Sequence, residues 1–153
     1  MNDHPAEHDK GVLSVYSGGR EWRAELTSFV FTDDQFAKVL RSFDDGAFIY
    51  PDRHEWRIFF EDDLFWSLAW QKARPIGRHP RGRPSVEVLN AKYLTRGLAR
   101  YFKLATGQPA GGSCVTATGG PFCRFARTVF KIVRPGRPPP TPRTILRHLA
   151  SGR

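Results

Sequence analysis

Acidic residues are almost absent from the second half of this chain. Residues 72–153 carry 17 Lys or Arg and a single acid, Glu87, a net charge of +16, whereas residues 1–71 carry 7 Lys or Arg and 14 Asp or Glu, a net charge of −7. A segment with this excess of positive charge repels itself unless something neutralises it. The candidates are DNA or another polyanion, an acidic membrane surface, an acidic protein, and the acidic half of the same chain.

Cysteine and long apolar runs are also scarce. Cys114 and Cys123 are the only cysteines, and a Cys-X8-Cys pair with no nearby His cannot complete a tetrahedral zinc site. We therefore expect two reduced thiols, no metal and no other cofactor. No apolar run approaches the length of a membrane span, and the N-terminus lacks the basic-then-apolar pattern of a signal peptide. These features predict a cytoplasmic protein with no membrane partner.

Aromatic residues, in contrast, are plentiful enough for a core. The 153 residues include 12 Phe, 4 Trp and 4 Tyr, and a chain of this length fits one domain. We expect a disordered tail over residues 1–10, one globular domain over 11–133 that is acidic up to 71 and basic from 72, and a Pro-rich linker with a short tail helix over 134–153.

The apolar spacing predicts a mainly α fold. After a short β hairpin formed by residues 12–16 and 21–26, about four helices are expected, near 32–45, 62–74, 85–106 and 121–133. The last two are expected to pack as an antiparallel pair.

Local signals support two of these assignments. Thr32 and Gln35 have the spacing of a capping box, which places a helix start at Thr32. Residues 51–53 are predicted to be a turn between two extended aromatic segments, although residues 56–60 could instead lead into the second helix.

Cations recur on the outer faces of the last two predicted helices. They are Lys92, Arg96, Arg100 and Lys103 on the first helix, and Arg124, Arg127 and Lys131 on the second. Their helical spacing predicts a basic stripe beside each buried face, and such stripes are typical of phosphate-contacting surfaces.

A short motif precedes this stripe. The run Pro80-Arg81-Gly82-Arg83-Pro84 resembles the core of an AT-hook, in which an extended Arg-Gly-Arg lies in the narrow minor groove of A·T-rich DNA. The resemblance implies that Arg81 and Arg83 enter the groove, that Gly82 permits close approach, and that Arg78 contacts phosphate. Alternatively, the same residues only fix an extended lead-in to the helix that follows.

A broader resemblance covers residues 82–133. The chain is similar there to small uncharacterised proteins encoded beside integrases and prophage genes in proteobacteria, on the residues Gly82 to Pro84, Leu94, Leu98, Tyr101, Thr106 to Pro109, Gly120 to Phe122, Arg124 and Phe125. It implies a mobile-element accessory protein and carries no activity with it.

Catalysis is not indicated. Asp52, Glu55 and the acids at 61–63 faintly resemble the carboxylates of a metal-dependent nuclease. No Glu-X-Lys follows at a suitable spacing, however, and capping or turn roles account for several of these acids. The sequence therefore favours a non-catalytic DNA-binding accessory or regulatory protein of a bacterial mobile element. The alternative is a protein-interaction module, such as an anti-CRISPR-like inhibitor of host defence.

Overall fold

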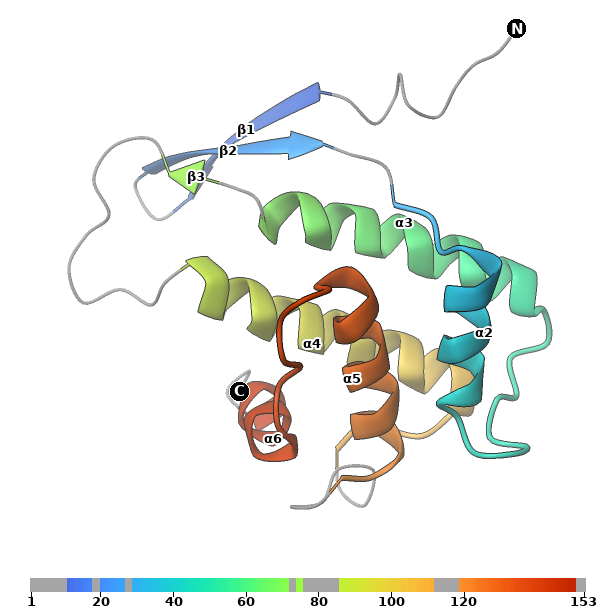
Figure 1. Cartoon of the computed structure of the whole chain (residues 1–153). Helices are drawn as coiled ribbons and strands as arrows, with labels where there is room; N and C mark the ends of the chain where they lie inside the picture. The colour runs from blue at the N-terminus through green and yellow to red at the C-terminus, as the bar shows by residue number, and fades with distance from the viewer. Residues whose placement is uncertain are drawn as a thin grey trace, which may run out of the picture.

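The computed structural model describes residues 11–17, 20–26, 29–71, 74–75, 86–111 and 119–150. This part of the chain is mainly helical, which confirms the predicted class (Figure 1). The helices are α2 (Asp33–Arg41), α3 (Arg53–Gln71), α4 (Val86–Thr106), α5 (Pro121–Val133) and α6 (Pro142–Ala150). The strands are β1 (Gly11–Ser17), β2 (Arg20–Leu26) and β3 (Arg74–Pro75).

The strands form one antiparallel sheet in the order β1-β2-β3. Val15 of β1 lies opposite Trp22 of β2, and Trp22 lies opposite Pro75 of β3. The sheet lies at one end of α3, with β2 in contact with that helix (Figure 1). The sheet thus places β3, which follows α3 in the sequence, beside the N-terminal strand β2.

Helix α2 begins as its sequence predicts. The Thr32 hydroxyl accepts the N–H of Gln35 at 3.1 Å, and the Gln35 side-chain oxygen accepts the N–H of Thr32 at 2.9 Å. This reciprocal pair satisfies two N–H groups that the helix cannot bond itself. The helix ends at Arg41, four residues before the predicted boundary, where the N–H of Ser42 bonds the carbonyls of Lys38 and Val39.

Helix α3 begins much earlier than predicted. It starts at Arg53, so the predicted extended segment over residues 56–60 was wrong and the alternative, that these residues belong to the helix, is confirmed. The physical reason is Asp52, whose side chain accepts the N–H groups of His54 and Glu55 at 3.0 and 3.1 Å. This N-cap outweighs the strand propensity of the aromatic run.

Trp56 is the centre of the core. Its side chain is fully buried, and its indole Nε1 donates to the carbonyl of Tyr101 at 3.1 Å. Six rings surround it with centroids 4.9 to 6.3 Å away, those of Phe36, Phe43, Phe48, Phe60, Tyr101 and Phe125. Aromatic pairs at these separations add stabilisation beyond their buried area. Tyr93 of α4 does not belong to this core and is 59% exposed.

The helix pairing differs from the predicted one. Helix α4 runs antiparallel to α3, whereas α5 crosses α4 (Figure 1). The Tyr101 hydroxyl donates to the carbonyl of Phe59 at 3.1 Å, and Arg100 forms an ion pair with Asp63. The higher-numbered residue of α4 thus contacts the lower-numbered residue of α3, as expected for antiparallel helices. The apolar face of α5 covers the aromatic core through Phe122, Phe125 and Val129.

The proline-rich segment returns the chain to the core. Arg127 of α5 donates from Nε to the carbonyl of Pro140 at 3.1 Å. Thr141 then accepts the N–H of Thr144 at 3.2 Å and caps α6. Ile145 of α6 is fully buried, and α6 packs against α4. The tail helix is therefore docked on the helical core.

Candidate nucleic-acid interface

Two of the predicted cations pair with acids from the other half of the chain. Arg100 lies 3.3 Å from Asp63 of α3, and Arg124 pairs with Asp44 in the loop after α2. All four side chains are more than a third exposed, and exposed pairs of this kind contribute about 0–1 kcal/mol each. The basic half is thus neutralised in part, and weakly, by the acidic half.

Lys92 and Arg96 lie at the contact between α4 and α6. Both are half-buried, and the Arg96 guanidinium lies 5.9 Å from the centroid of the Tyr93 ring. Arg96 Nε and Nη2 are buried and have no hydrogen-bond partner among the residues that the structure describes. Burial, with the nearby charges of Arg147, Lys92 and Arg96, lowers the pKa of His148 on α6. The packing of α6 against α4 therefore gathers like charges from the two helices around His148.

The remaining predicted cations of α4 and α5 differ in exposure. Lys103 and Lys131 are exposed, and neither forms an ion pair within the described residues. Arg127 is half-buried and held by the Pro140 carbonyl. The predicted stripe is therefore divided among exposed, paired and partly covered positions.

The AT-hook residues cannot be placed relative to this surface. Arg78, Arg81, Gly82 and Arg83 lie outside the described residues. The hook interpretation therefore stays a prediction from sequence.

A basic groove between α2 and α5 was missed by the sequence analysis. It encloses about 560 Å³ and is lined by Gln35, Lys38, Arg41, Ser42, Thr128, Lys131, Ile132 and Pro135. Lys131 belongs to the predicted set, but Lys38 and Arg41 come from the acidic half of the chain. Their signal was the spacing of two cations in the last turn of α2. The net negative charge of residues 1–71 concealed this pair of cations.

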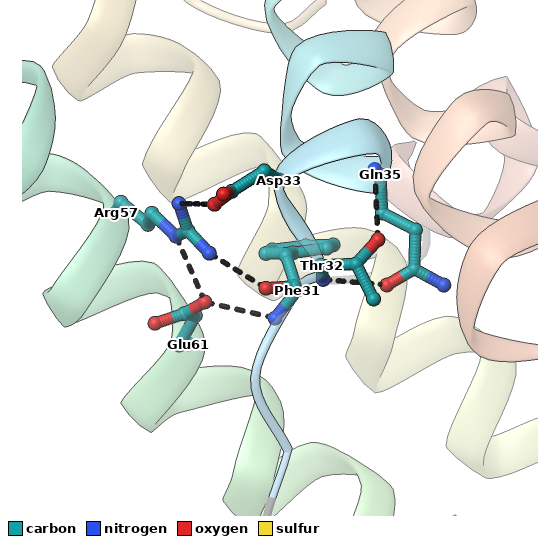
Figure 2. Close-up of polar contacts among 6 residues, drawn as sticks. All are labelled: Phe31, Thr32, Asp33, Gln35, Arg57 and Glu61. Carbon is teal, nitrogen blue, oxygen red and sulfur yellow. Dashed lines mark hydrogen bonds and ion pairs between the residues drawn. The ribbon is translucent and has the colours of Figure 1, made fainter.

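The acids of the nuclease hypothesis have structural partners. Asp52 caps α3, and Glu55 accepts the Tyr50 hydroxyl at 2.6 Å. Glu61 accepts the N–H of Phe31 and an Arg57 N–H, at 2.9 and 3.1 Å (Figure 2). Among the described residues there is no group of three or more His, Cys, Asp or Glu that could hold a metal ion.

The comparisons with known proteins add no constraint. No family model, curated protein or solved structure matches this chain. Within the ranges that the structure describes, none of the helices combines the length and the apolar character needed to cross a membrane.

Proposed function

We propose that this protein binds nucleic acid without catalysis, through phosphate contacts made by its basic half. One observation carries the proposal: of the seven predicted cations on α4 and α5, only Arg100 and Arg124 form ion pairs among the described residues. A cation without a protein carboxylate beside it can neutralise a phosphate and release the counterion condensed there, which drives binding.

The burial pattern supports specific contributors. Lys103 and Lys131 are exposed and stand near the ends of α4 and α5, where long side chains can reach a ligand backbone without desolvating a charge in the core. Lys92 and Arg96 are half-buried and therefore contribute less. Arg100 and Arg124 can exchange their weak, exposed carboxylate partners for phosphate.

The biological setting is part of the proposal. We propose a cytoplasmic accessory or regulatory role in a bacterial mobile element, with the hook residues Arg81 and Arg83 as additional contacts to A·T-rich DNA. This setting is supported by sequence resemblance alone, and the phosphate contacts do not depend on it.

Fluorescence polarisation with the full chain tests the proposal. A·T-rich duplex, G·C-rich duplex and single-stranded DNA are titrated over a range of salt concentrations. Three double variants are compared with the wild type: Arg81→Ala/Arg83→Ala for the hook, Lys103→Ala/Lys131→Ala for the helices, and Lys10→Ala/Arg53→Ala as a control that removes equal charge elsewhere.

Each outcome assigns the site or rejects it. Loss of A·T-rich binding only in the hook variant establishes the AT-hook. Weakening only in the Lys103/Lys131 variant places the contacts on the helices. Equal weakening in all three variants means that net charge alone attracts the nucleic acid, and no binding by the wild type at physiological salt rejects the proposal.

A protein-interaction module is the second candidate, and one exposed apolar pair favours it. Phe59 of α3 and Leu104 of α4 are 50% and 49% exposed. They lie one turn away from the Asp63–Arg100 pair on antiparallel helices, so both flank the same contact. Such a module would bind no free nucleic acid at physiological salt, and a Phe59→Ser/Leu104→Ser variant would lose its protein partner.

A further inference from the structure

The groove between α2 and α5 combines positive charge from two helices that are far apart in the sequence. Lys38 and Arg41 reach it from α2, and Lys131 reaches it from α5. All three side chains are exposed. No carboxylate lines the groove, and none of the three cations forms an ion pair within the described residues.

The polar groups of the groove divide into donors and acceptors. Ser42 and Thr128 donate their hydroxyl hydrogens to the carbonyls of Val39 and Arg124, so these hydroxyls are not free to donate to a ligand. Gln35 differs, because its side-chain oxygen is used by the Thr32 N–H and its amide nitrogen points away from that contact (Figure 2). The groove therefore offers three cations and one amide donor.

Helix dipoles explain why each of the three cations lies near the end of its helix, but they do not explain why all three line the same groove. Lys38, Arg41 and Lys131 all occupy the last turn of their helices, where positive charge is favoured. The dipole favours a positive charge anywhere around the last turn, so it does not require the three side chains to face one another. Like charges around one hollow repel each other, and a concave site concentrates their field on whatever occupies it.

We propose that this groove binds a phosphoryl group. A phosphate dianion presents several strong acceptor oxygens to the Lys and Arg donors, and Arg41 can bond two of them at once. The groove is larger than a phosphate requires, and Ile132 and Pro135 supply an apolar wall for an attached group. The source is a phosphate of nucleic acid or a small phosphorylated molecule such as a nucleotide.

The inference deepens the proposed function in the first case and stands apart from it in the second. If the groove binds nucleic-acid phosphate, it becomes the most concentrated of the phosphate contacts. If it binds a small phosphorylated molecule, nucleic acid can fail to bind while the groove remains a site. The experiment must therefore distinguish both sources.

Amide chemical shifts of the full chain, titrated at constant ionic strength, give the direct test. The probes are inorganic phosphate, adenosine monophosphate, and a short oligonucleotide, each against a chloride reference. We expect saturable shifts confined to residues near the ends of α2 and α5. The variant Lys38→Ala/Arg41→Ala/Lys131→Ala should bind the preferred probe at least about tenfold more weakly, as expected when hydrogen bonds to a charged group are lost.

A second triple variant controls for charge. Arg53→Ala/Arg143→Ala/Arg147→Ala removes the same number of exposed cations outside both the groove and the proposed nucleic-acid contacts and should keep the groove shifts. Lys131→Arg should retain binding and Lys131→Glu should lose it, which separates a ligand contact from a folding effect.

The outcomes are decisive for this site. Equal weakening in both triple variants, or shifts that do not saturate with any probe, overturns the inference. A preference for adenosine monophosphate over the oligonucleotide assigns a small ligand, and the reverse preference assigns nucleic acid. Nucleic-acid binding that survives loss of the groove cations rejects nucleic acid as the ligand of the groove and leaves the proposed function intact; if adenosine monophosphate and inorganic phosphate also bind as before, the groove itself is rejected.

Discussion

Replacing Arg57 should destabilise the protein more than replacing any fully exposed arginine of the acidic half. The Arg57 guanidinium bonds Glu61 at 3.1 Å, the carbonyl of Phe31 at 2.6 Å and Asp33 at 3.3 Å (Figure 2). It also lies 4.8 Å from the centroid of the Phe36 ring. These contacts join the start of α2 to α3.

The burial of each partner sets the magnitude. Asp33 is 99% exposed, so its pair contributes about 0–1 kcal/mol. Glu61 is only 13% exposed and Arg57 only 20%, and hydrogen bonds to charged groups in such surroundings contribute about 1.5–3 kcal/mol. After a discount for the remaining solvent access, Arg57→Met should lower the free energy of unfolding by about 3 kcal/mol.

Urea denaturation, followed by tryptophan fluorescence, measures this loss. Arg53→Met is the matched control, because the Arg53 side chain is exposed and its only described contact is the Phe48 ring at 5.4 Å; it should cost at most about 1 kcal/mol. In a double-mutant cycle with Glu61→Gln, the coupling should be about 1–2 kcal/mol. If Arg57→Met costs no more than Arg53→Met, the reasoning from burial is refuted.

Three further predictions concern the core and the tail helix. Trp56→Phe removes the indole bond to the Tyr101 carbonyl and should cost about 2 kcal/mol in urea denaturation, a loss below about 0.5 kcal/mol contradicting the assigned role. The pKa of His148 is lowered in the folded state, so the unfolded chain takes up the proton more readily and stability should fall as pH drops below about 6.5. His148→Gln should flatten that part of the stability profile, and an unchanged slope would show that other groups cause it. Burial raises the pKa of the Cys123 thiol, so in a Cys114→Ser background a thiol reagent should label the native protein at least about a hundredfold more slowly than the urea-unfolded protein, and comparable rates would contradict the buried position.

Helices α2 and α5 could be predicted from the sequence because each has a local pattern that favours only a helix. The Thr32–Gln35 pair satisfies N–H groups wherever a helix begins, so its spacing alone located α2. The apolar face of α5 contains Phe122, Phe125 and Val129 at helical spacing, and all three are fully buried. Neither element needs a distant residue to define it.

The start of α3 was not predictable in the same way because two signals compete there. The aromatic run after Asp52 favours a strand locally, and the Asp52 side chain favours a helix. Packing of Trp56 against rings from α2, α4 and α5 acts in the same direction as the Asp52 N-cap. Those partners are distant in the sequence, so this contribution to the helix is not contained in the periodicity.

The candidate nucleic-acid surface could likewise be predicted only where it depends on local spacing and not on tertiary contacts. Lys103 and Lys131 could be identified from helical spacing, and both are exposed. Lys38 and Arg41 could not be assigned to the same surface, because the contact between α2 and α5 is a property of the fold. The spacing likewise gave no sign that α6 packs against α4, since a short helix after a proline-rich segment can dock or remain free.

The salt dependence of nucleic-acid binding tests the central claim most directly. The full chain is titrated with one duplex at a series of salt concentrations, beside Lys103→Ala, Lys131→Ala and the control Arg53→Ala. We expect the logarithm of the binding constant to fall linearly with the logarithm of salt, and each of the first two variants to reduce the magnitude of this slope by about 0.9. Arg53→Ala should leave the slope unchanged. Absence of binding at physiological salt, or a slope that none of the three substitutions alters, would contradict phosphate contacts by these helices.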